Sequence, residues 1–248
     1  MVLMKGASMN RKNLVGLAFV TAFAVGCGGG LPTFGADLAK QSTPMGDVRV
    51  PYTSMVNYFG YVQPGAQPDE VREGKKMFYL YMWVPIVAPE IGVRMVSPVA
   101  NLAKPTDKDF VDTNFAANAA DATNYFDTWV RVERCLTAIN PEDIVKPCDQ
   151  WTNYGDNDDS SELPAQPSGS KYNSVLRITS EPSDPLKALI RGMYRIGFTT
   201  YKVGEVQGSF LAQVGAPIEL PGTAIARTPA DLHKIVTAPA PAAAPAAN

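Results

Sequence analysis

The stretch Met77-Phe78-Tyr79-Leu80-Tyr81-Met82-Trp83-Val84 decides the fold, because it is apolar at successive positions that point to opposite faces of a strand. A strand that is apolar on both faces is typical of the centre of a β-sheet with both faces covered. Pro85 has no backbone N–H to give to a ladder, so we expect the strand to end there. The sequence therefore predicts a central, doubly buried strand at residues 77–84.

The segments around this strand also have β character. Gly and Pro together account for 41 of 248 residues and separate short blocks rich in aromatic and β-branched residues. Further strands are expected at residues 54–62, 92–97, 125–134 and 172–178. Residues 193–202 and 206–215, joined by a turn at 203–205, are typical of a β-hairpin. The expected fold is all-β with short helices, an antiparallel jelly-roll β-sandwich.

Three brief helices interrupt the strands. Asn140-Pro141 and Thr228-Pro229 each pair a capping residue with proline at the first helical position, and residues 183–190 begin in the same way. The long segment 101–124, rich in Ala and Asp, is expected to be a loop with one helical turn.

Charge and motifs exclude several function classes. The net charge of −2 and the pI near 5.5 provide no field for nucleic acid, so we expect no nucleic-acid partner. The sequence has no phosphate-binding glycine loop and no clustered Cys and His for zinc. The single histidine, His233, falls on the last predicted helix, where a solvated helix face is a better explanation than catalysis. We therefore expect no enzymatic activity and no catalytic residues.

The N-terminus is expected to be a targeting segment. Arg11 and Lys12 precede a run of about a dozen mostly apolar residues, 14–25, which is too short to span a membrane. Small residues at 24–26 come directly before Cys27, as in a bacterial lipobox, whose cysteine is acylated; a plain secretory signal is the alternative. From the N-terminus, the expected organisation is a signal peptide 1–26, a flexible tether 27–47 after lipidated Cys27, a β-sandwich 48–222, a short helix 223–237 and a disordered Pro/Ala tail 238–248.

The two other cysteines form an even pair. Cys135 and Cys148 in an exported protein meet the conditions in which disulfides persist, although two buried thiols are the alternative.

An acidic run lies at residues 154–162, Tyr-Gly-Asp-Asn-Asp-Asp-Ser-Ser-Glu. Four carboxylates within seven residues repel one another unless counter-ions or a divalent cation lie among them. A solvated loop and a calcium site both satisfy this requirement. An EF-hand does not fit, because Ser161 replaces the glycine and Pro167 the final glutamate of that loop.

Several blocks of the sequence, from about Pro51 to Gly215, share a pattern with a known family: YFGYVQPG at 58–65, FYLYMWVP at 78–85, GVRMVSP at 92–98, FDTWVRVER at 126–134, KYNS at 171–174 and FTTYK at 198–202. In this order, the blocks resemble the major surface lipoprotein family of pathogenic leptospires.

The resemblance implies a calcium-binding jelly-roll sandwich on an outer-membrane lipoprotein that binds extracellular-matrix proteins. It assigns the calcium ligands to Asp127 and Thr128, to two adjacent loop aspartates that align with Asp158 and Asp159, and to the Tyr172 carbonyl. Asn157, Ser160 and Ser161 interrupt the family's aspartate run, and the cysteine pair and the short C-terminus also depart from the family pattern.

The expected function is a lipid-anchored, surface-exposed outer-membrane protein, an adhesin that contacts matrix-like macromolecules, with a homodimer among its possible assemblies. A structural envelope lipoprotein that faces the periplasm and has no adhesive role is the alternative. Exposed aromatics such as Trp129 are either part of a binding surface or cross-strand packing residues.

Overall fold

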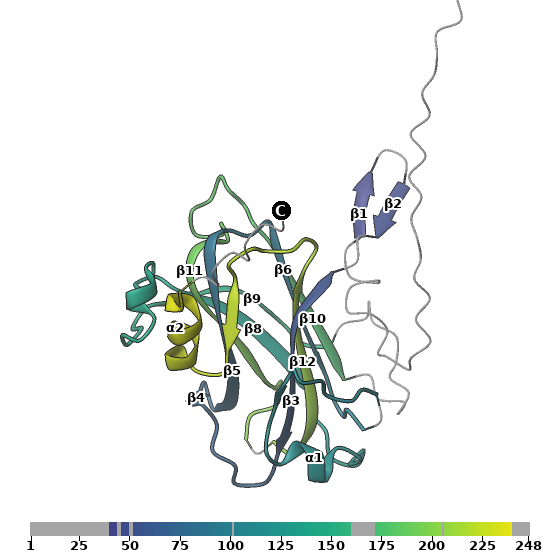
Figure 1. Ribbon diagram of the computed structural model, residues 1–248. Helices are drawn as coiled ribbons and strands as arrows, with labels where there is room; N and C mark the ends of the chain where they lie inside the picture. Colours follow the sequence, from purple (N-terminus) through teal and green to yellow (C-terminus); the bar gives the residue numbers. More distant parts are fainter. Residues whose placement is uncertain are drawn as a thin grey trace, which may run out of the picture.

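The computed structural model describes residues 40–43, 46–49, 52–100, 102–159, 172–204 and 206–239 (Figure 1). The expected signal peptide, Cys27 and most of the Pro/Ala tail lie outside these residues. Within them, no helix is both long and apolar enough to cross a membrane.

Two sheets face each other, and all their strand pairs are antiparallel except the short parallel pair of β3 and β7. One has the strand order β10-β6-β12-β3-β7 and the other β13-β5-β11-β8-β9, with β4 paired to β5 outside that path. The strand bounds are β3 Thr53–Val62, β4 Glu70–Arg72, β5 Lys75–Val87, β6 Glu90–Val96, β7 Phe110–Val111, β8 Thr128–Cys135, β9 Trp151–Asn157, β10 Asn173–Thr179, β11 Ile190–Thr200, β12 Gly208–Ala216 and β13 Ala224–Ala226. A separate pair, β1 (Lys40–Thr43) and β2 (Gly46–Arg49), precedes the sandwich.

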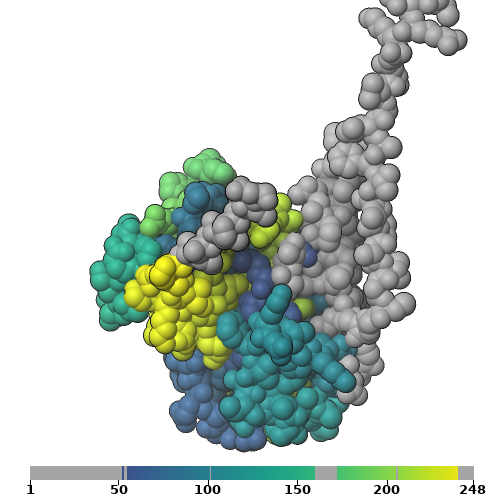
Figure 2. All heavy atoms as spheres, in the orientation of Figure 1, coloured from purple at the N-terminus to yellow at the C-terminus, as the bar shows by residue number. Residues whose placement is uncertain are grey.

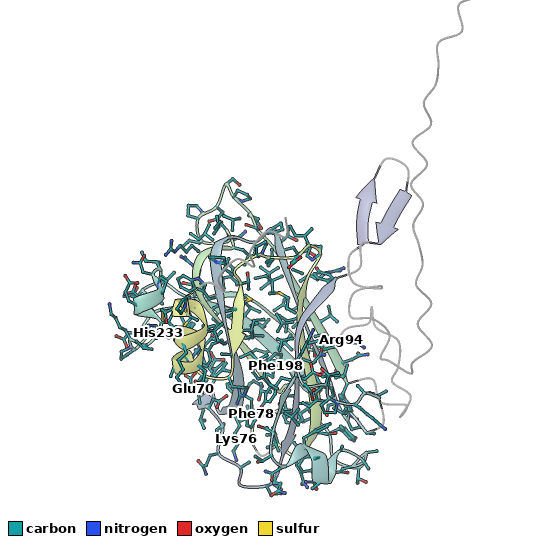
Figure 3. All side chains as sticks on the ribbon, in the orientation of Figure 1. Glu70, Lys76, Phe78, Arg94, Phe198 and His233 are labelled. Atoms are coloured by element: carbon teal, nitrogen blue, oxygen red, sulfur yellow. A yellow bond between two sulfur atoms is a disulfide. The ribbon has the colours of Figure 1, made fainter. Side chains whose placement is uncertain are left out.

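The core fills the space between the two sheets. Alternate residues of β5, β8 and β11 meet those of β6 and β12, and the pairs Val130 and Val132, and Val93 and Met95, are fully buried. Phe78 and Phe198, opposite each other on β5 and β11, lie in this interior (Figure 3). Each such side chain contributes about 1.5–3 kcal/mol when it leaves water. The prediction of an all-β sandwich is confirmed, whereas its jelly-roll assignment stays a prediction.

The central strand β5 is longer than expected. It continues through Pro85 to Val87, so the prediction that Pro85 ends the ladder is wrong. The register between β5 and β11 shifts between Ile190 and Gly192, beside Pro85. Because an irregular position requires no ladder donor, the proline is tolerated there.

Two other local predictions are also wrong. Strands β11 and β12 do not form a hairpin, because β11 pairs with β5 and β8 whereas β12 pairs with β3 and β6 in the opposite sheet. Residues 183–189 form turns, with no helix, and the Asp184 carbonyl accepts from both Lys187 and Ala188.

The other helix predictions are confirmed in kind. The 3-10 helix η1 (Pro141–Asp143) has a capping box, and α1 (Phe115–Asn118) is the single turn within the long loop. The helix α2 (Pro229–Thr237) begins with Thr228 accepting from the Asp231 N–H. Strand β13 pairs with Trp83, Met82 and Tyr81 of β5, so the sheet extends past the boundary expected at residue 222.

The strands give the sandwich two distinct ends. At the proximal end, Thr53 pairs with Ala216 and Val87 pairs with Ile190, so the chain enters the domain here. At the distal end lie the start of β8 and the end of β11, where Thr128 pairs with Thr200.

Candidate functional site

Three strand ends meet at the distal end. β8 begins at Thr128, β9 ends shortly before Asp159, and β10 begins just after Tyr172. Asp159 forms an isolated bridge with Ser174, which connects the end of β9 to β10 across the two sheets. Asp127 precedes β8, and its carbonyl accepts from the Tyr201 N–H at 2.6 Å. Because Asp127 lies outside the regular strand, it is not bound by the rule that adjacent residues point to opposite faces.

The hydroxyl groups of Thr128 and Ser174 lie at the centre of this junction. Their oxygens are 2.7 Å apart, and the Ser174 hydroxyl is also 2.7 Å from the Thr128 carbonyl, to which it donates. The Thr128 hydroxyl is 3.5 Å from Oδ1 of Asp159, at the outer limit of a hydrogen bond. This long hydrogen bond therefore stabilises the charged Asp159 carboxylate only weakly.

The electrostatics indicate crowded negative charge at Asp159. Burial raises the pKa of its carboxyl, and the charges of Asp127 and Asp158 raise it further, against the lowering effect of hydrogen bonds from Thr128 and the Asn173 backbone. Among the described residues, Lys202 forms an ion pair with Asp127, in which its largely exposed ammonium lies 3.9 Å from Oδ2, and Lys75 also acts on Asp127 through its charge. An ion pair with so exposed an ammonium contributes little. The three neighbouring carboxylates Asp127, Asp158 and Asp159 thus concentrate negative charge that favours a cation.

Tyr172 borders the junction on the other side. Its carbonyl accepts from the Ser97 N–H at 3.1 Å. Its ring stacks on the half-exposed ring of Tyr125, with 4.8 Å between centroids. Burial and the neighbouring Tyr125 raise the pKa of the Tyr172 phenol.

The donor chemistry fits a hard divalent cation, since calcium takes oxygen ligands from carboxylates, carbonyls and hydroxyls. The structure brings Asp127, Thr128, Asp159 and Tyr172 to one junction, and Asp158 acts on it through its charge. Among the described residues, however, no three Asp, Glu, His or Cys side chains form a group that could hold a metal ion. The geometry thus supplies candidate ligands without a complete coordination shell.

Sequence reasoning missed two residues of the junction. The sequence shows Ser174 only as the last residue of the KYNS block, whereas in the structure its hydroxyl joins β8 to β10. Lys202 follows a strand end and showed no pattern of its own. The alternation of β10 could have placed Ser174, but not its partner.

Other residues singled out from the sequence have structural roles. Cys135 and Cys148 form a disulfide with Cα atoms 6.0 Å apart, which closes the loop that holds η1. Trp129 is buried and stacks under the Arg131 guanidinium, 4.7 Å from the ring centroid, so it is a packing residue. His233 lies on α2 and its backbone carbonyl accepts from Thr237.

Comparison with known protein families places the chain in one of them. The family model described as "Lipl32: Surface lipoprotein of Spirochaetales order" matches residues 46–225, well over half of the chain. No curated protein matches. The matched range begins before β3 and ends within β13, so it includes the sandwich strands from β3 to β12 in full and part of β13.

Proposed function

Because the chain belongs to the Spirochaetales family of surface lipoproteins, we propose that it is a lipid-anchored outer-membrane protein whose sandwich binds one calcium ion. In this proposal Cys27 carries the lipid. Asp127, Thr128, Asp158, Asp159 and the Tyr172 carbonyl are the ligands. The distal end contacts extracellular-matrix-like macromolecules.

One observation carries the calcium proposal. The pKa of Asp159 is raised by burial and by two neighbouring carboxylates, and the nearby Lys202 pair is long and exposed. When bound, calcium would supply the charge that these carboxylates lack. The protein's own groups would orient it, because the Thr128–Ser174 hydroxyl pair fixes the start of β8 against β10.

The sign of the pH dependence follows from the same shift. A carboxyl whose pKa is raised in the folded state destabilises that state as pH rises from 3.8 through the raised pKa. Without calcium, Asp159→Asn should therefore be at least as stable as the wild type at neutral pH. With calcium the order should reverse, because binding to the folded state stabilises the wild type by about 2.7 kcal/mol at a hundred times Kd.

Thermal unfolding with calcium and with chelator tests the metal site. The wild type should melt at a higher temperature in calcium, and the double variant Asp158→Asn with Asp159→Asn should not respond. The matched control is Glu181→Gln with Asp184→Asn, which removes two carboxylates at the proximal end. Equal melting temperatures of the wild type in calcium and chelator would refute the calcium proposal.

The surface proposal has a separate test. Protease treatment of intact cells should cleave a surface-exposed protein and leave a periplasmic lipoprotein intact. Half-exposed Tyr125 and Tyr201 at the distal end favour a partner there, since aromatic residues are enriched at interface cores. Immobilised matrix proteins should bind the wild type more strongly than a Tyr125→Ser variant, and equal binding would remove the distal end from the contact.

A further inference from the structure

Four large apolar side chains are exposed together at the proximal end. Ile86 is 75% exposed, Val87 54%, Leu186 64% and Ile218 54%; we refer to these four as the apolar rim. Scattered exposed apolar residues are common, but several at one end of a domain indicate an interaction site.

The loops that carry the rim lie beside one another. Val87 pairs with Ile190, and the Ala88 N–H donates to the Leu189 carbonyl at 2.8 Å, which holds the β5–β6 turn against the loop of Leu186. The loop of Ile218 follows β12 and approaches Pro85, whose Cγ would lie 3.3 Å from a Cβ added at Gly222. Figure 1 shows the green and yellow-green loops beside the β5–β6 turn, and Figure 2 shows the first as a green knob beside the blue turn.

The loop of Leu186 is acidic on balance. Lys187 lies 3.4 Å from a Glu181 oxygen and 4.0 Å from an Asp184 oxygen, so two acids face one lysine, and exposed Glu219 follows Ile218. A surface of this kind attracts an uncharged interface by its apolar side chains and not by positive charge.

The connector from the N-terminus reaches the domain at this same end. Tyr52 is the first described residue after the gap at residues 50–51, its hydroxyl bonds to Glu90 at the start of β6, and Thr53 pairs with Ala216. A lipid at Cys27 is therefore connected to the end that carries the apolar rim.

We propose that the apolar rim contacts the lipid bilayer in which the chain is anchored, with Ile86, Val87, Leu186 and Ile218 in the interfacial zone. The inference rests on the lipid anchor of the proposed function. Exposed apolar side chains bind a membrane interface in proportion to the area they bury. The rim therefore orients the anchored sandwich with its distal end away from the membrane.

Fluorescence quenching by lipid tests this arrangement on the full chain. An environment-sensitive dye is attached to Leu186→Cys at the rim or to Val203→Cys at the distal end. The native residues are similarly exposed, Leu186 at 64% and Val203 at 68%. The proteins are reconstituted into phosphatidylcholine vesicles that contain a brominated lipid. Quenching at position 186 should exceed that at 203 by about threefold or more, because only the rim reaches the interface.

A rim variant provides the second measurement. In the same vesicles, Ile86→Ser with Ile218→Ser should lower the lipid quenching at position 186 toward the level at position 203, since two large apolar side chains no longer leave water. The paired variant Val111→Ser with Val203→Ser removes two exposed apolar side chains away from the rim and should leave the quenching at position 186 unchanged. This quenching should change little between low and high salt.

The experiments test the rim and the lipid anchor separately. Equal quenching at 186 and 203 overturns the rim proposal. Energy transfer between dyes at 186 on two copies, without quenching by lipid, also overturns it and assigns the rim to a second copy. Mass spectrometry of residue 27 tests the anchor separately: if no lipid is present, the anchor is wrong, while quenching at 186 on addition of vesicles still decides the rim.

Discussion

Replacing Glu133 with glutamine is the sharpest test of how the outer face of the six-stranded sheet is held together. Glu133 is 1% exposed. One carboxylate oxygen lies 2.6 Å from Arg72 Nη1 and the other 2.7 Å from Arg195 Nε. Arg195 also reaches Glu70, 2.7 Å from Nη1. The cluster connects β4 and β5 to β8 and β11.

The expected cost follows from what the change leaves behind. Removing one partner of a buried ion pair costs about 3–5 kcal/mol, because the other charge stays buried without compensation. Here Arg195 keeps Glu70 and stacks on two rings, 4.6 Å from that of Tyr79 and 4.2 Å from that of Trp151. Arg72 is 27% exposed and remains hydrated. These compensations place the loss of unfolding free energy near the lower limit, about 3 kcal/mol.

Urea unfolding followed by circular dichroism measures the change. With a slope near 2 kcal/mol/M, Glu133→Gln should lower the midpoint by about 1.5 M and leave the slope unchanged. The control is Glu73→Gln, whose carboxylate is 64% exposed and lies 3.6 Å from Arg131, and it should cost less than about 1 kcal/mol. Equal midpoints for the two variants would refute the assignment of Glu133 as a buried, structure-holding charge.

Three further predictions concern other parts of the sandwich. Cys135→Ser with Cys148→Ser should lower the unfolding free energy by about 3 kcal/mol, measured by denaturation without reductant, because the bridge closes a loop with a sequence separation of 13. Gly208→Ala should cost about 2 kcal/mol or more in the same assay, since its φ is +123° and an added Cβ would lie 2.3 Å from the Asn124 carbonyl oxygen. Hydrogen bonding, first from the Asn124 side chain, lowers the pKa of Asp121 to about 2, so this carboxylate stabilises the fold above about pH 4 and the contribution is lost as pH falls toward 2. Acid titration of Asp121→Asn should lack that part of the wild-type loss.

The sequence predicts individual strands well because a strand's own side chains determine its pattern. The apolar run at 77–84 lies within the central strand β5, and the alternation at 125–134 placed Val130 and Val132 in the core. The residue at which a strand ends is less predictable. Pro85 is tolerated because the partner strand β11 shifts its register, and β11 lies about a hundred residues away in sequence.

Strand partners could not be predicted from local pattern. The turn after β11 has the composition of a hairpin turn, yet it carries the chain from one sheet to the other. Two strands have the same alternation of apolar and polar residues whether they pair with each other in one sheet or face each other across a core. Only long-range pairing separates the two cases, with β11 between β5 and β8, and β12 between β3 and β6.

The failed helix at residues 183–190 has a local cause. The start signal is present, but the Asp184 side chain accepts from the Leu186 N–H and the Ser180 hydroxyl oxygen accepts from the Leu189 N–H. These side chains satisfy the backbone in a turn conformation that competes with a helix. This turn conformation leaves Leu186 exposed, whereas a helix packed on the sheet would have buried it.

Strand direction explains why the candidate calcium site and the apolar rim occupy opposite ends. β11 begins beside the rim at Ile190 and ends beside Thr128, and its 11 residues span roughly 35 Å at 3.3 Å each. Changes separated by more than about 10 Å with no shared partners usually add. Ile86→Ser with Ile218→Ser should therefore leave the calcium-dependent rise in melting temperature unchanged, and Asp158→Asn with Asp159→Asn should leave the lipid quenching at position 186 unchanged. A change in either measurement would refute the independence of the two ends and would mean that the strands that connect them transmit the effect along their length.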